Sequence, residues 1–266
     1  MKERITLGQY YQADSVLHRM DPRVKLTGTI VYIVALFVAG NVWGYLLATV
    51  FLVTVIALSQ VPVRFMLRGM KSIALLIAIT VFFNLFMTPG EELYSIWKLK
   101  ITREGLYIAV TMAIRLVYLI MGSNIMTLTT TPNQLTDGLE SLLSPLKVLH
   151  APVHEVAMMM SIALRFIPIL MEETDKIMKA QMARGASFDE GNLIERAKSL
   201  VPLLVPLFVS AFRRAGDLAL AMEARCYRGG EHRTKMKPLH YELRDYVGYA
   251  VLVVLITAAI VIRVLL

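Results

Sequence analysis

The stretch between Lys25 and Arg64 contains no lysine or arginine, and it constrains the fold more than any other feature of the sequence. Of the 266 residues in the chain, 56% are hydrophobic, whereas soluble domains contain roughly 45–50%. Residues 1–20 are polar and lack the apolar core of a cleaved signal peptide. The composition therefore predicts a polytopic membrane protein of the all-α class.

Five apolar stretches are predicted to cross the membrane, because a spanning helix needs roughly 17–25 mainly apolar residues. They cover residues 26–40, 43–60, 72–88, 105–129 and 246–262. With their flanking segments, residues 1–130 and 241–266 are expected to form a transmembrane module. Residues 131–240 contain shorter apolar runs, and we expect a cytoplasmic module of long amphipathic helices there.

Basic residues precede the first predicted span and follow the second, whereas the turn that connects these two spans is uncharged. They are Arg19, Arg23, Lys25, Arg64, Arg68 and Lys71. The positive-inside rule then places the N-terminus in the cytoplasm. Lys235, Lys237 and Arg244 precede the last span, which should run outward, and the loop from Glu91 to Glu104 has balanced charge. This asymmetry explains the net charge of +8, so no nucleic-acid partner is predicted.

The predicted cytoplasmic module begins with an amphipathic helix and continues with two long helices. Thr131-Pro132-Asn133-Gln134 has the form of a capping box with proline at the first helical position, and the leucine stripe continues to Lys147. The two long helices lie between about Val153 and Arg228. Their apolar runs, 156–171 and 200–212, favour oblique or cytoplasmic helices, although seven spans would preserve the same orientation.

Both long helices end in the same pattern, Ala-x-x-Ala-Arg. The first finishes at Ala183-Arg184-Gly185 and the second at Ala224-Arg225-Cys226. Helix termination would explain a single such arginine, because a cation favours the C-terminal dipole and glycine supplies a left-handed cap. The repetition favours an interface, because a planar guanidinium binds the carboxylates or carbonyls of a partner.

Nucleotide and metal sites are not predicted. The chain contains no phosphate-binding glycine motif, so any ATP would be hydrolysed by another subunit. His150 and His154 lie near Glu155, but Pro152 interrupts a continuous helical face and disfavours a zinc site. The single cysteine, Cys226, excludes an internal disulfide and a cysteine-based metal cluster.

Three polar residues fall inside predicted spans: Asn84, Arg115 and Asn124. An intramembrane arginine is costly and is a functional candidate by default. No Asp or Glu lies in the first four predicted spans, so we expect Arg115 to be a structural hydrogen-bond donor inside the bundle. The alternative is a self-sufficient, ion-coupled secondary carrier that uses these three residues.

Several segments resemble one family along nearly the whole chain. They are Ser15 to Leu26, Gln134 to Pro145, Ala157 to Pro168 and the two arginine patterns. Together they are similar to the transmembrane T component (EcfT) of energy-coupling factor transporters, the CbiQ/EcfT-like family. These proteins belong to vitamin and trace-metal importers of the ABC type in prokaryotes.

The resemblance implies a non-catalytic subunit of the prokaryotic cell membrane. It would join two ABC-type ATPases, typically a heterodimer of EcfA-type proteins, to a membrane-embedded S component that binds the substrate. Arg184 and Arg225 would insert into the ATPases, which would bind ATP and magnesium, while this chain would bind no cofactor. Met158, Met159, Met160, Leu203, Leu204 and Leu207 are the candidate contacts for the S component. One departure from the family pattern is Cys226 at the place of a glycine, which puts a glycine-type cap at the second site in question.

Overall fold

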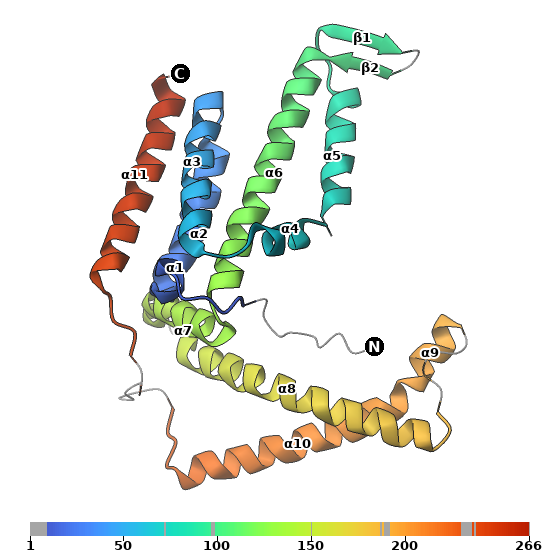
Figure 1. Ribbon diagram of the computed structural model, residues 1–266. Coiled ribbons are helices and arrows are strands. Elements are labelled where there is room, and N and C mark those ends of the chain that lie inside the picture. The colour runs from blue at the N-terminus through green and yellow to red at the C-terminus, as the bar shows by residue number, and fades with distance from the viewer. Residues whose placement is uncertain are drawn as a thin grey trace. The chain divides into compact units, whose positions relative to one another are not determined.

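The computed structural model describes residues 10–71, 73–96, 99–149, 151–186, 188, 192–229, 236 and 238–265. Packing divides the chain into two compact units, Met1–Leu142 with Leu239–Leu266, and Leu143–Pro238. The regular secondary structure of the described residues is helical apart from one short hairpin, which confirms the all-α class (Figure 1). Packing units do not define a membrane boundary, so the transmembrane and cytoplasmic modules stay a prediction.

Four helices form the centre of the first unit: α2 (Pro22–Val38), α3 (Val42–Ser59), α6 (Arg103–Thr129) and α11 (Leu243–Leu265). Their shared core includes Tyr32, Leu36, Leu52, Ile125 and Leu255, each at most 5% exposed. A short helix, α1 (Val16–Arg19), precedes α2, and α7 (Pro132–Leu143) follows α6. The Tyr11 amide donates to the carbonyl of Leu128 at 2.9 Å, so the described segment before α1 is held against α6.

Among the described residues, four helices are long and apolar enough to cross a membrane: α3, α6, α11 and α8 (Val153–Ala183). The first three coincide with predicted spans, whereas α2 has 17 residues and α5 (Ala74–Met87) has 14. A helix of 14 residues is about 21 Å long, shorter than the roughly 30 Å hydrocarbon core of a bilayer. By length and composition α8 is a further candidate span, so its cytoplasmic placement stays a prediction.

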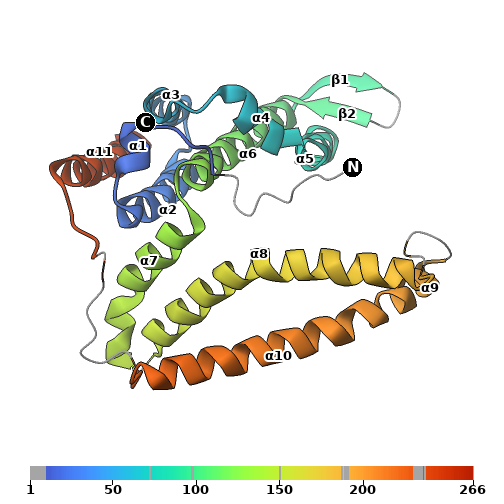
Figure 2. The ribbon, with the colours of Figure 1, turned by 60° about the horizontal axis from the view of Figure 1, so that its bottom comes forward.

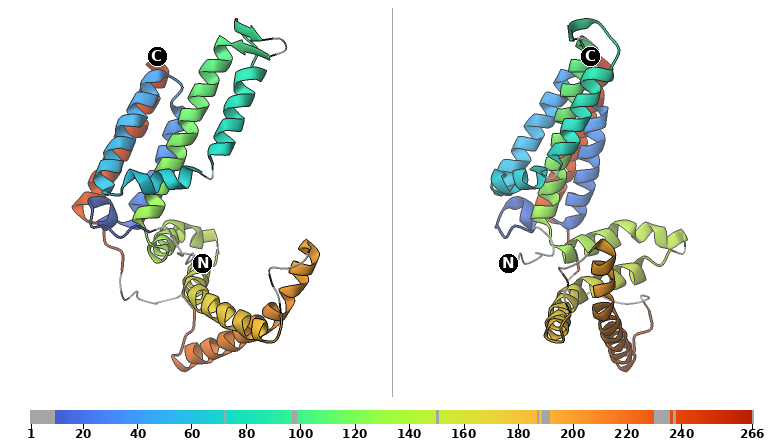
Figure 3. Two further views of the ribbon diagram at one scale, coloured as in Figure 1. Left: turned by 45° about the vertical axis from the view of Figure 1, so that its right-hand side comes forward. Right: turned by 90° about the vertical axis from the view of Figure 1, so that its right-hand side faces the viewer.

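Two connections predicted as loops contain regular structure. The basic segment after α3 forms α4 (Val63–Lys71), and the segment after α5 forms an antiparallel hairpin of β1 (Glu92–Ile96) and β2 (Leu99–Thr102). Figure 3 shows this hairpin at the end that α5 and α6 share. The loop predictions were wrong because they considered charge alone, whereas amphipathic spacing and residues that favour strands also determine local structure.

The second unit is built around α8 and α10 (Val201–Ala224), which run antiparallel (Figure 2). In the sequence, α9 (Leu193–Ser199) connects α8 to α10, and this helix was not predicted. A 3₁₀ helix, η1 (Ser144–Leu149), precedes α8. The amphipathic helix predicted to reach Lys147 instead ends at Leu143. Pro145 explains this end, because it cannot donate the next helical hydrogen bond.

Polar contacts link α8 and α10 along their length. The Gln181 side chain donates to the carbonyl of Pro202 at 3.5 Å, near one end of the pair. Farther along, Arg214 donates to Glu173 at 3.3 Å. Pro168 and Pro206 lie inside the two helices without ending them. Each helix therefore continues from its apolar half into its polar half.

Candidate functional site

The end of α8 is a Schellman motif centred on Arg184. The Gly185 amide donates to the carbonyl of Met182, and the Ala186 amide donates to that of Gln181, both at 3.0 Å. Gly185 has φ +89°, and the left-handed conformation is easy for a residue without Cβ. Arg184 is thus the last residue before the chain turns away, and its side chain is exposed.

The end of α10 repeats this geometry around Arg225. The Cys226 amide donates to the carbonyl of Glu223 at 2.8 Å, and the Tyr227 amide donates to that of Met222 at 3.0 Å. Cys226 has φ +56°, so it occupies the left-handed position that Gly185 occupies at the first site. The cap that the sequence left in question is present without a glycine.

The two arginines lie at opposite ends of the antiparallel pair (Figure 2). The 24 residues of α10 correspond to about 36 Å at 1.5 Å per residue, which sets the scale of their separation. Both side chains are exposed, and neither has a hydrogen-bond partner in the part of the chain that the structure describes. This arrangement offers two separate cationic ends.

The six apolar candidates on the same helices do not share one environment. Met159 is 57% exposed and Leu204 is 47% exposed, whereas Leu203 is only 5% exposed. Met160 is also exposed, and Met158 and Leu207 are half-buried. Leu203 therefore belongs to the interior of the second unit, and the exposed members are the ones available to a partner.

The structure does not bring the three intramembrane polar residues together. Asn84 donates to the carbonyl of Thr80 in its own helix, α5, at 2.8 Å. The Asn124 side chain is 3.5 Å from the carbonyl oxygen of Met66 in α4. Arg115 donates from Nε to the Tyr45 hydroxyl in α3 at 3.0 Å. These separate partners do not assemble the shared ion site that a secondary carrier would need.

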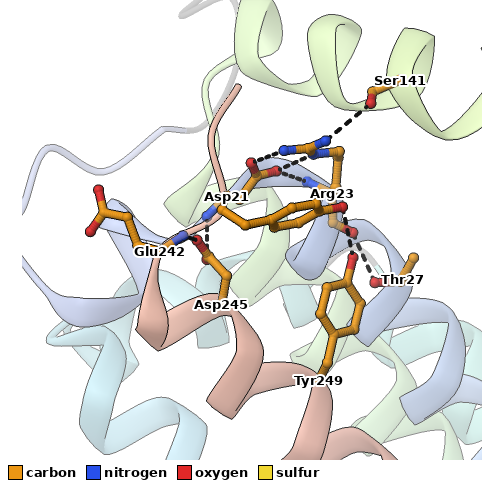
Figure 4. A network of polar contacts seen from close by, with 8 residues as sticks. Asp21, Arg23, Thr27, Ser141, Glu242, Asp245 and Tyr249 are labelled. Carbon is orange, nitrogen blue, oxygen red and sulfur yellow. Dashed lines mark hydrogen bonds and ion pairs between the residues drawn. The ribbon is translucent and has the colours of Figure 1, made fainter. Parts of the chain in front are cut away.

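A buried polar network, which we call the hub, connects the starts of α2 and α11 (Figure 4). Asp245 is 1% exposed and accepts two hydrogen bonds of 2.8 Å, from the amides of Asp21 and Glu242. Those amides belong to the N-caps of two neighbouring helices, whose positive dipole ends lie together. A carboxylate there stabilises both N-termini at once.

Arg23 extends the hub to α7. Its Nε and Nη2 bind the two carboxylate oxygens of Asp21 at 3.0 and 2.8 Å, and its Nη1 lies 3.4 Å from the Ser141 hydroxyl. The guanidinium also lies 3.8 Å from the ring centre of Tyr241. Hydrogen bonding to Asp21 raises the pKa of Arg23 above its usual value. The hub thus joins α2, α7 and the segment before α11.

Lys25 joins the hub to the end of α6. Its ammonium donates to the carbonyls of Thr129 at 2.8 Å and His18 at 3.3 Å. Thr129 ends α6, where a cation favours the helix dipole. Burial lowers the pKa of Lys25 to about 8, while the carboxylates of Asp21 and Asp245 oppose this shift.

Two hydrogen bonds orient the His18 ring. Its Nε2 lies 2.9 Å from the carbonyl of Tyr11, which can only accept, so Nε2 carries the proton. In the neutral ring Nδ1 accepts from the Ser15 hydroxyl at 2.7 Å. Burial lowers the pKa of His18. These contacts give a structural role to residues within Ser15 to Leu26.

Sequence reasoning missed the C-terminal half of the hub. Asp245 is separated from Asp21 by 224 positions, and no local pattern pairs residues so far apart. The available signal was a carboxylate immediately before a predicted span and immediately after Arg244. A buried acid at the start of an apolar helix therefore indicates a helix-capping contact.

Comparison with known proteins identifies the family of the chain. Residues 13–236 match the family model for CbiQ, described as a cobalt transport protein. The chain belongs to the CbiQ family. This confirms the resemblance drawn from the N-terminal segment and the paired arginine patterns.

Curated relatives within the CbiQ family match nearly the full chain. The energy-coupling factor transporter transmembrane protein EcfT of Thermosediminibacter oceani is 55% identical over 245 residues, 92% of each chain. The protein of the same name from Clostridium kluyveri is 52% identical over 99% of this chain and 98% of its own. That from Bacillus subtilis is 49% identical, covering 92% and 93%. With its apolar helices, this CbiQ family member is a multi-pass membrane protein related to transporter components.

Proposed function

We propose that the chain is the transmembrane coupling subunit of an energy-coupling factor importer. It would transmit ATP-driven motion of two partner ATPases to a substrate-binding S component that takes up vitamins or related micronutrients. The observation that carries the proposal is the pair of capped, exposed arginines at opposite ends of α8 and α10. The names of the curated relatives support the same transporter class.

Two separated arginines suit two separate ATPase subunits better than one binding pocket. A guanidinium fork can bind acidic or carbonyl groups in a groove of each ATPase. The Schellman caps hold each arginine at the end of a continuous helix, so displacement of either end would be passed along that helix. In this proposal α8 and α10 act as levers, and ATP and magnesium bind to the ATPases.

The exposed apolar residues of α8 and α10 would contact the S component. The side chains of Met159, Leu204 and Phe208 are between 47% and 60% exposed. Together they form an apolar surface on α8 and α10 that the described residues of the second unit leave uncovered. Methionine adapts to different shapes, so such a surface suits exchange among several S components. The proposed setting is the cell membrane, with the N-terminus in the cytoplasm.

The hub would anchor this machinery. It binds α7, and the second unit begins where α7 ends. Gly138 of α7 lies so close to α2 that an added Cβ would be 3.1 Å from Cβ of Pro22 and 3.2 Å from Leu26. If α7 is held in place by the hub, motion of α8 would be transmitted to a partner and would not be absorbed by movement of α7.

The test uses charge reversal at the two arginines in the assembled transporter. Arg184→Glu and Arg225→Glu should each lower ATP-driven uptake into proteoliposomes by about tenfold or more, since each removes a charge-assisted contact. Membrane insertion of the chain should be unchanged. The measurements are substrate uptake, ATP hydrolysis and the amount of ATPase that co-purifies.

Two matched variants separate the proposed contact from a general effect of charge. Arg213→Glu makes the same charge change at an exposed position of α10 away from its end, and it should retain uptake. Arg225→Lys keeps the charge but loses the planar fork, so it should be intermediate. Normal uptake by the variant with both Arg184→Glu and Arg225→Glu would contradict the role of these residues.

A further inference from the structure

Arg115 lies in the apolar helix α6 with only part of its hydrogen-bonding capacity used. Its Nε donates to the Tyr45 hydroxyl at 3.0 Å, and its Nη1 makes a weak contact of 3.9 Å with the sulfur of Met112. A guanidinium has five N–H donors. The Nη2 nitrogen has no partner within the described residues, and it is not buried.

Aromatic rings surround this guanidinium on the side of α2 and α3. Its Cζ lies 5.5 Å from the ring centre of Phe37 and 5.9 Å from that of Tyr45. The Tyr45 hydroxyl accepts from Arg115, so its own proton stays available for donation to a third group. Arg115 and Tyr45 therefore present a joint set of donors.

Within the part of the chain that the structure describes, the helices of the first unit that pack around α6 supply no anion for Arg115. The helices α2, α3, α4 and α5 contain no Asp or Glu at all. The only acid in α6 is Glu104, in the first turn, and the only acid in α11 is Asp245, which belongs to the hub. An unpaired arginine in a membrane span costs several kcal/mol even by low estimates, so a counter-anion is expected from outside the chain.

The surroundings favour a lipid as the source of that anion. Phe37 is 58% exposed, and Trp43, in the first turn of α3 close to Tyr45, is 60% exposed. Tryptophan and tyrosine near a helix end are typical of the headgroup layer. Arg115 is half-buried beside this surface, so its free donors can be reached by a headgroup phosphate.

We propose that Arg115 and Tyr45 form a binding site for the phosphate of a phospholipid headgroup. The guanidinium would bind two phosphate oxygens, and the Tyr45 hydroxyl would hold the guanidinium and donate to a third oxygen. Phe37 would pack beside the lipid. This site is independent of the coupling role proposed for Arg184 and Arg225.

The experiment is native mass spectrometry of the chain in its membrane-extracted form, with phosphatidylglycerol titrated as the probe. Arg115→Gln should weaken the tightest phosphatidylglycerol binding by about tenfold, equivalent to roughly 1.4 kcal/mol. Arg115→Lys should weaken it less, because the charge stays and the fork is lost. Tyr45→Phe, which keeps the ring, should weaken it in the same direction as Arg115→Lys.

Arg263→Gln is the matched control, because Arg263 is an exposed arginine in the last turn of another apolar helix. It should leave the tightest binding unchanged. Equal phosphatidylglycerol binding by wild type and Arg115→Gln would overturn the proposal. Loss of a co-purifying membrane protein in Arg115→Gln, with lipid binding unchanged, would also overturn it and assign the anion to a partner's carboxylate.

Discussion

Two residues of different type occupy the same backbone conformation at the arginine ends. Gly185 has φ +89° and Cys226 has φ +56°, and both donate the same cap hydrogen bond. A residue with Cβ in this region is strained by roughly 1–2 kcal/mol. The cysteine is tolerated because the Schellman hydrogen bonds at the end of α10 satisfy carbonyls that would otherwise lack partners.

Alanine substitution at two glycines with space for a side chain distinguishes the cost of a positive φ from the cost of poor packing. A Cβ added at Gly185 or at Gly216, inside α10, would have no atom within 4 Å. Gly185→Ala should destabilise the protein by about 1 kcal/mol because of its positive φ. Gly216→Ala should stabilise it by about 1 kcal/mol, since alanine favours a helix. Thermal unfolding in detergent measures both, and a shared sign would contradict the assignment.

His18 gives the hub a defined dependence on pH. Burial lowers its pKa in the folded protein, whereas the unfolded chain binds a proton near pH 6.5. The unfolded state therefore binds more protons below that pH, so the contribution of His18 to stability is lost as the pH falls. Between pH 7.5 and 5.5, the melting temperature of wild type should fall more than that of His18→Gln. Parallel curves would show that His18 does not carry this dependence.

At the scale of elements, the hub offsets the repulsion between the positive dipole ends of α2 and α11. Both helices begin at the hub, so their positive dipole ends lie side by side. Asp245 and Asp21 place negative charge there, and Lys25 places positive charge at the end of α6. In the hub, carboxylates therefore lie at helix N-termini and an ammonium lies at a helix C-terminus.

Replacement of Asp245 tests this account. Asp245→Asn removes the charge that two buried amides share, and should destabilise the protein by about 2–3 kcal/mol. Glu242→Gln is the control, because the Glu242 side chain is 63% exposed and its pair with Arg244 should contribute less than about 1 kcal/mol. Chemical denaturation in detergent measures the difference. Equal effects would show that Asp245 is not the capping group for both helices.

Close packing of α5 on α6 depends on Gly105. A Cβ at this position would lie 2.9 Å from the carbonyl oxygen of Asn84 and 3.1 Å from that of Leu85. Gly105→Ala should therefore separate the two helices and cost about 1–3 kcal/mol. Gly40→Ala is the control, because nothing lies within 4 Å of its added Cβ. An unchanged melting temperature for Gly105→Ala would contradict the packing of α5.

At the scale of the whole molecule, the two arginine ends should act as a bivalent attachment. If each binds one subunit of an ATPase pair, the second contact forms at high effective concentration after the first. Arg184→Glu or Arg225→Glu alone should leave part of the ATPase bound, while the variant with both changes should lose nearly all of it. Co-purification against salt concentration measures this, and single variants as weak as the combined one would contradict bivalency.

Much of the molecule could be predicted from local sequence. The uncharged stretch after Lys25 predicts membrane helices because crossing a bilayer requires consecutive apolar residues. The capping box at Thr131 is confirmed by reciprocal hydrogen bonds of 3.1 and 3.3 Å with Gln134. The arginine patterns were recognisable because cap, arginine and small residues lie within one turn. Each of these signals spans only a few residues.

Only the tertiary structure decided which distant residues meet. It placed Arg184 and Arg225 at opposite ends of one helix pair, joined Asp245 to Asp21, and gave Arg115 a partner in Tyr45. The chain's apolarity and helix ends are set by neighbouring residues, whose propensities and hydrogen bonds are local. Contacts between helices depend on their direction and on which face packs inward, and these are properties of the folded bundle.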